Sequence, residues 1–83
     1  MSDSPAPGSR VLVLGLGRFG GGLATVRWLR ARGLRVLVSD AGDPASLAVP
    51  AREAARLGAT VAFGPQTPAL LEEVDLVVAN PAI

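Results

Sequence analysis

The chain has 83 residues, enough for a single small domain, and its hydrophobic content of 49% suits a well-filled core. It has no cysteine and no histidine, which excludes disulfides and argues against a transition-metal site. The net charge is only +1, the arginines are scattered and aromatic residues make up 4% of the chain, so we expect no nucleic-acid partner. No apolar run approaches the roughly 20 residues that cross a bilayer, so we expect no membrane association and a cytoplasmic location.

The first nine residues are polar and rich in proline, without the apolar segment of a signal peptide. We therefore expect residues 1–9 to form a disordered leader and residues 10–83 to form the folded domain. That domain starts with the apolar run Arg10–Leu14. Continuous hydrophobicity of this kind is typical of a strand in a parallel sheet that is buried on both faces.

A glycine-rich turn follows this strand directly and is the most informative feature of the sequence. It has the pattern G-x-G-x-x-G and comprises Gly15, Leu16, Gly17, Arg18, Phe19 and Gly20. The pattern is typical of nucleotide-binding βαβ units: the first glycine permits a tight turn and the second lets the backbone approach a phosphate. The third lets the next helix pack closely on the strand, and the N-terminus of that helix offers N–H groups to an anion.

The helix after the turn is predicted over Arg18–Arg32, and Gly33 is a favourable residue to end it. Helical spacing predicts that the face toward the sheet consists of Leu23, Ala24, Trp28 and Ala31. The remaining face would be solvated and carry Arg27, Arg30 and Arg32, which suit the dipole at the helix C-terminus.

The rest of the chain repeats the alternation of strand and helix. Strands are predicted at Arg35–Ser39, Thr60–Phe63 and Asp75–Ala79. Between them we expect a loop at Ala41–Pro50, a helix at Ala51–Leu57 that ends at Gly58, and a short helix that includes Ala69–Glu73. This alternation predicts an α/β fold, a Rossmann-like open parallel sheet of about four strands in the order 3-2-1-4 with helices on both faces.

Polar residues at the ends of two strands complete the candidate site. Asp40 follows Gly20 by 20 residues, where such folds place an acid near a ribose or a base. Its alternative role is to cap the turn that follows. Asn80 ends the last strand and would face the crevice between strands one and four, unless it serves only the turn before Pro81. Arg18 would either reach a phosphate or point to solvent.

The sequence has no histidine, cysteine or lysine to activate a nucleophile, and it has no P-loop for ATP. We therefore expect a binding domain with no catalytic residue, no metal site and no activity of its own. The sequence stops directly after the last predicted strand, which would leave a sheet edge exposed. We accordingly expect it to be the front piece of a longer protein.

Three segments carry a more specific signal: GLGRFGGGLATVRWL, RVLVSD and RLGATVAFGPQTPALLEEVDLVVANPAI. Together they resemble the N-terminal domain of the Mur ligases over essentially all of Val11–Ile83, and most closely the members that add D-glutamate. The resemblance implies a domain that binds the uridine diphosphate (UDP) part of UDP-N-acetylmuramoyl-L-alanine. ATP and Mg²⁺ would bind in a central domain and D-glutamate in a third, within a ligase of cytoplasmic peptidoglycan synthesis.

The resemblance also implies roles for individual residues of the site. Arg18 and Phe19 would offer N–H groups to the diphosphate, and Asp40, Ala41 and Gly42 would contact the uracil. The uridine would also lie near Asn80 and Ala82.

Two other functions share this fold. The glycine turn, the second strand and Asp40 also resemble NAD-binding regulatory modules of the potassium-conductance type, and a dehydrogenase fragment is a third alternative. The regulatory modules usually have a Gly-Asp-Ala-type turn where this chain has Phe63-Gly64-Pro65-Gln66. A P-loop encoded beyond Ile83 would favour the ligase.

Overall fold

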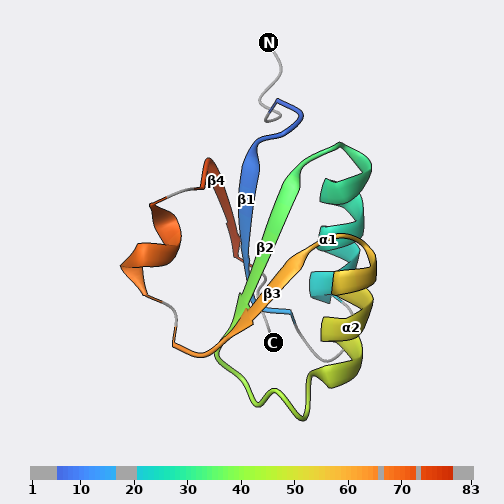
Figure 1. Cartoon of the computed structure of the whole chain (residues 1–83), viewed down its shortest axis with the longest axis vertical. Helices are drawn as coiled ribbons and strands as arrows, with labels where there is room; N and C mark the ends of the chain where they lie inside the picture. The colour runs from blue at the N-terminus through green and yellow to red at the C-terminus, as the bar shows by residue number, and fades with distance from the viewer. Residues whose placement is uncertain (1–5, 17–20, 66, 73, 80–83) are drawn as a thin grey trace.

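A computed structural model of the chain describes residues 6–16, 21–65, 67–72 and 74–79. Four strands form one parallel sheet in the order β3-β2-β1-β4 (Figure 1), which confirms the predicted order. They are β1 (Arg10–Leu14), β2 (Arg35–Asp40), β3 (Thr60–Phe63) and β4 (Leu76–Ala79). The bounds of β1 and β3 are as predicted, β2 is one residue longer, and β4 begins one residue later.

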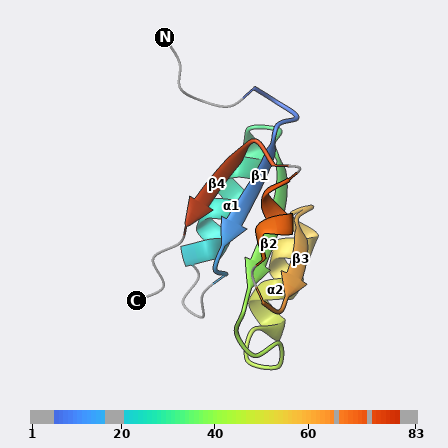
Figure 2. The same cartoon turned by 90° about the vertical axis from the view of Figure 1, so that its left-hand side faces the viewer.

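Two α-helices, α1 (Gly21–Ala31) and α2 (Ala48–Arg56), contact each other and cover the same face of the sheet. The short 3-10 helix η1 (Pro68–Leu71) connects β3 to β4 and lies on the other face (Figure 2). Helices therefore lie on both faces, but both α-helices lie on one. The second α-helix begins three residues before its predicted start. Pro50 lies in its first turn, where main-chain N–H groups have no partner within the helix, so the N–H that proline lacks costs no hydrogen bond.

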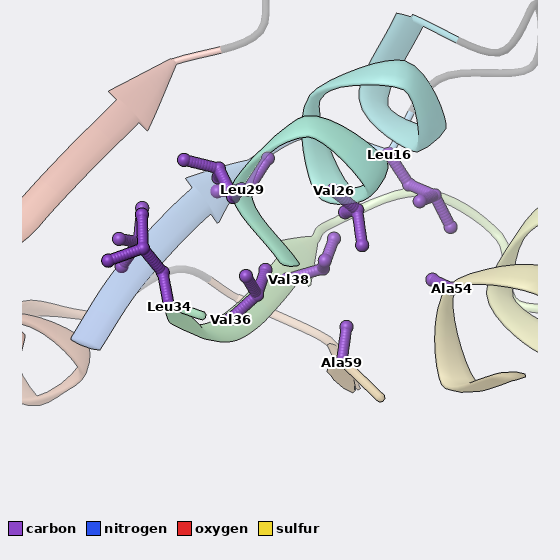
Figure 3. Close-up of a cluster of buried hydrophobic side chains, with 10 residues drawn as sticks. Leu16, Val26, Leu29, Leu34, Val36, Val38, Ala54 and Ala59 are labelled. Carbon is purple, nitrogen blue, oxygen red and sulfur yellow. The ribbon is translucent and has the colours of Figure 1, made fainter. Parts of the chain in front are cut away.

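The hydrophobic core lies between the sheet and the two α-helices (Figure 3). Side chains alternate along a strand, so every second residue of β1 and β2 points toward the helices, and the valines of both strands occupy these positions. The strand residues meet apolar side chains from both helices and from the segments that flank them. Each of these core side chains is at most 7% exposed: Val11, Val13, Leu16, Val26, Leu29, Leu34, Val36, Val38, Ala54 and Ala59.

The predicted sheet-facing side of α1 was wrong at three of its four residues. Val26 and Leu29 are buried, whereas Ala24 and Ala31 are exposed and the indole of Trp28 is 51% exposed. The guanidinium of Arg32 lies 3.6 Å from the centre of the Trp28 ring, in a cation–π contact at the surface. Only Leu23, which is partly buried, packs against the core as predicted.

Arg30 does not belong to a solvated face either. Its Nε donates to the carbonyl of Leu57 (2.9 Å) and its Nη1 donates to the carbonyl of Leu34 (2.8 Å), in partly buried positions. These carbonyls lie just before β3 and β2. Arg30 therefore joins the C-terminal ends of α1 and α2 at the amino edge of the sheet, by which we mean the end where the strands begin.

Main-chain hydrogen bonds also connect residues 6–9 to this amino edge. The N–H of Gly8 donates to the carbonyl of Gly33 (2.9 Å), and the N–H of Arg35 donates to the carbonyl of Ser9 (2.9 Å). The leader predicted over residues 1–9 stays a prediction, because residues 1–5 lie outside the described part of the chain. No helix among the described residues is long and apolar enough to cross a membrane.

Candidate functional site

The candidate site lies at the carboxyl edge of the sheet, where the strands end. In the register of the sheet, Leu14 at the end of β1 pairs with Ser39 of β2 on one side and with Ala79 of β4 on the other. The chain leaves β1 toward α1 on one face and enters β4 from η1 on the other. In open α/β sheets, such a point between neighbouring strands is where ligands bind.

The described part of the glycine turn is held tightly to β2. Gly15 has a φ of +96°, in the left-handed region that favours glycine, and its N–H donates to the carbonyl of Ser39 (2.8 Å). This agrees with the role in a tight turn that the sequence pattern predicts. The side chain of Leu16 is fully buried in the core, so any contact of Leu16 with a ligand would come from its main chain.

Gly22 shapes the candidate site, and the sequence reasoning missed it. Its N–H donates to the carbonyl of Leu16 (3.0 Å), and a Cβ at this position would lie 2.1 Å from that carbonyl oxygen. The start of α1 can therefore approach the turn only because residue 22 has no side chain. The sequence pattern assigns the close packing of the helix on the strand to Gly20, which lies outside the described residues, so that role stays a prediction. The run of three glycines at positions 20–22 was the available signal.

Asp40 connects the glycine turn to the loop after β2. Its Oδ2 accepts a hydrogen bond from the N–H of Leu16 (2.8 Å), and its Oδ1 accepts one from the N–H of Gly42 (2.7 Å). The predicted site residues Gly15, Leu16, Asp40 and Gly42 are therefore brought together, and Ala41 lies exposed between the last two. The capping role that we had set against ligand binding is present in the bond to Gly42.

A second aspartate gives the rest of this loop its shape. Asp43 Oδ1 accepts from the N–H of Ala45 (3.1 Å), and its Oδ2 accepts from the hydroxyl of Ser46 (3.2 Å). The side chain of Leu47, which is 5% exposed, anchors the end of the loop in the protein. The loop that begins at the candidate site is therefore folded back on itself by local hydrogen bonds.

Six predicted site residues lie outside the described part of the chain: Gly17, Arg18, Phe19, Gly20, Asn80 and Ala82. Their contacts stay predictions. Within the described residues, no group of three or more acidic, histidine or cysteine side chains could hold a metal ion. A cavity of about 400 Å³ lies between η1 and the amino ends of the strands, lined in part by Arg10, Arg35 and Glu72. It is at the opposite end of the sheet from the glycine turn and belongs to a different region.

Comparison with known proteins agrees with this geometry. Residues 9–83 match the family model of the Mur ligase MurD-like, N-terminal domain. The chain belongs to this MurD-like N-terminal domain family. The match includes β1, the glycine turn, Asp40 and β4, which are the elements that form the candidate site.

Curated relatives of the MurD-like chain carry the name UDP-N-acetylmuramoylalanine–D-glutamate ligase. The protein from Myxococcus xanthus is 42% identical over 76 residues, which cover 92% of this chain and 16% of the relative. The protein from Geobacter metallireducens is 37% identical over 76 residues, with the same coverage. The protein from Paraburkholderia xenovorans is 42% identical over 74 residues, which cover 88% of this chain and 14% of the relative. The chain thus spans about a sixth of the length of these relatives.

Proposed function

We propose that this chain is the UDP-binding domain of an ATP-dependent ligase that joins D-glutamate to UDP-N-acetylmuramoyl-L-alanine in peptidoglycan biosynthesis. The observation that carries the proposal is the match of residues 9–83 to the MurD-like N-terminal domain, in a chain whose glycine turn is joined to the β2 loop by the bond from the Leu16 N–H to Asp40. The name of the similar ligases supports the substrate. Cytoplasmic localisation follows from the same proposal.

The proposal assigns a part of the nucleotide to each segment of the site. Main-chain N–H groups of residues 17–20 and the N-terminus of α1 would bind the diphosphate, because a helix N-terminus favours negative charge. The loop of Asp40, Ala41 and Gly42 would lie beside the uridine, with Asn80 and Ala82 on its other side. ATP, Mg²⁺ and D-glutamate would bind in other domains of the full-length protein, since this sequence has no P-loop.

A nuclear magnetic resonance titration of the ¹⁵N-labelled chain tests this proposal. UDP and UDP-N-acetylmuramoyl-L-alanine are each compared with NAD. We expect saturable shifts of the amide signals of Gly15, Leu16, Asp40 and Gly42 with the two uridine ligands and none with NAD. Shifts with NAD alone would favour the regulatory module or the dehydrogenase fragment, and no shifts with any ligand would also contradict the proposal.

A second measurement concerns the reaction. With ATP, D-glutamate and UDP-N-acetylmuramoyl-L-alanine present, this chain alone is expected to release no phosphate above background. Phosphate release that depends on all three substrates would show that the proposed division of labour between domains is wrong.

A further inference from the structure

The cavity at the amino edge lies apart from the candidate nucleotide site. Its volume of about 400 Å³ is within the range of cavities that hold small molecules. Residues at the amino ends of β1, β2 and β3 form one wall, and η1 with the residues just after it forms the other. The cavity therefore lies on the η1 face of the sheet, opposite the two α-helices (Figure 2).

Two arginines lie side by side on the sheet wall of this cavity. Arg10 and Arg35 are partners in the register of β1 and β2, and neighbouring strands lie about 5 Å apart. The residues that follow them, Val11 and Val36, belong to the core beneath the α-helices. Because side chains alternate along a strand, both arginines point to the η1 face and place two positive charges at the cavity.

The main chain of both arginines is fixed by hydrogen bonds. The N–H of Arg10 donates to Asp75 Oδ2 (2.8 Å), and the N–H of Asp75 donates to the carbonyl of Arg10 (2.7 Å). The N–H of Arg35 donates to the carbonyl of Ser9 (2.9 Å). Among the described residues, none forms a hydrogen bond or an ion pair with the guanidinium of Arg35. Within this part of the chain, its N–H donors are therefore available to a ligand.

The other lining residues limit which ligand can bind. Glu72 adds a carboxylate from the η1 side, so two arginines and one glutamate give the lining a net charge of +1. A ligand with a single negative charge balances this lining, whereas the carboxylate of Glu72 repels a phosphate dianion. The side chains of Leu37, Ala69 and Val74 are apolar and favour a ligand that has an apolar part as well.

We propose that this cavity is a second binding site, for a small organic acid in which one carboxylate is attached to an aliphatic chain. The carboxylate accepts hydrogen bonds from the guanidinium groups of Arg35 and Arg10, which match the geometry of a carboxylate. The aliphatic chain lies against Leu37 and Val74. The site goes beyond the proposed function, because it needs neither the glycine turn nor a uridine nucleotide.

Four probes separate the charge of the ligand from its apolar part. Hexanoate has both, acetate has only the carboxylate, 1-hexanol has only the aliphatic chain, and hexylammonium has the opposite charge. Each probe is titrated into the ¹⁵N-labelled chain, and the amide signals of Arg35, Leu37 and Thr60 are followed. We expect saturable shifts with hexanoate at a Kd of about 1 mM and binding at least about tenfold weaker for the other three.

Three outcomes of these titrations would overturn the proposal. The first is no saturation by hexanoate at about ten times that Kd. The second is equal binding of acetate, 1-hexanol or hexylammonium, which would show that the lining does not select a carboxylate with an aliphatic chain. The third is a set of shifts centred on Gly15, Leu16 and Gly42, which would place hexanoate at the carboxyl edge instead.

Substitutions of the charged residues test the assigned contacts. Arg35→Gln should weaken hexanoate binding about tenfold, because it removes a charge-assisted hydrogen bond. Glu72→Gln should strengthen it about threefold, because it removes a repelling charge. Both residues are exposed, so we expect both variants to stay folded. Unchanged affinity in Arg35→Gln, or weaker binding in Glu72→Gln, would contradict the site.

Arg32→Gln is the matched control for Arg35→Gln. Arg32 also lies at the amino edge but contacts Trp28 of α1, on the other face of the sheet. Its substitution removes the same charge and should leave the affinity for hexanoate within about twofold. Equal weakening in both arginine variants would show a general attraction of anions to this edge and would overturn the proposal. Shifts of the cavity amides on dilution of the ligand-free chain would also overturn it, because a second copy would then fill the cavity.

Discussion

The two edges of the sheet use charged side chains in the same way, with opposite signs. At the amino edge, the guanidinium of Arg30 donates to the carbonyls of Leu34 and Leu57. At the carboxyl edge, the carboxylate of Asp40 accepts from the N–H groups of Leu16 and Gly42. In each case one charged group satisfies main-chain groups that the strands and helices leave unpaired where they end.

The difference between the edges lies in what they connect. Arg30 joins the ends of two helices to the starts of two strands, far from the glycine turn. Asp40 joins two loops of the candidate site. Hydrogen bonds from one charged side chain to the main chain therefore stabilise the fold at the amino edge and fix the geometry of the candidate site at the carboxyl edge. Substitutions at the amino edge should lower the free energy of unfolding without changing the affinity for UDP, and substitutions at the carboxyl edge should change that affinity.

Gly22→Ala should have the largest effect and tests how closely the carboxyl edge is packed. A Cβ would lie 2.1 Å from the carbonyl oxygen of Leu16, so the helix and the glycine turn must move apart. We expect a loss of about 3 kcal/mol in the free energy of unfolding, measured by urea denaturation. Elsewhere in a helix the same change stabilises a protein by about 1 kcal/mol, so a stabilised variant would contradict the close approach.

Arg30→Met should have the next largest effect and tests the amino edge. The methionine keeps an apolar stem but loses both hydrogen bonds to carbonyls, so we expect the free energy of unfolding to fall by about 2 kcal/mol. Arg27→Met on the exposed side of the same helix is the matched control, with a change within about 0.5 kcal/mol. The affinity of the folded Arg30 variant for UDP should be unchanged. A selective loss of affinity would mean that the two edges are coupled.

The sheet was predictable because apolar runs, turn glycines and a strand–helix alternation all indicate the same topology. The strand order and most boundaries follow from that agreement. The face of α1 was harder, because apolar residues occur on several sides of this helix. Trp28 and Ala24 fit one helical stripe and Val26 and Leu29 fit another, and only packing against β1 and β2 selects the second.

The candidate site was predictable in its position but not in its bonds. The spacing of Gly15 and Asp40 places both at the carboxyl edge, as the structure confirms. No sequence pattern states that the Asp40 carboxylate meets the N–H of Leu16, because this contact depends on the register of β1 and β2. In the same way, Arg30 resembles any exposed helical arginine until the carbonyls of Leu34 and Leu57 are placed beside it.

Trp28→Ala should have the smallest effect and provides a reference that belongs to neither edge. The indole is half exposed and its described ring contact is with Arg32, so we expect a loss of about 1 kcal/mol in the free energy of unfolding. Leu29→Ala is the matched comparison on the same helix. Leu29 is 2% exposed, and its removal should cost about 3 kcal/mol. If Trp28→Ala cost as much as Leu29→Ala, Trp28 would belong to the core that the sequence pattern first indicated. A loss of about 1 kcal/mol would show that even a large aromatic side chain contributes little to the free energy of unfolding when it lies outside the two edges and the core. The larger losses expected for Gly22→Ala and Arg30→Met would then be due to the close contact and the hydrogen bonds that these residues make at the edges.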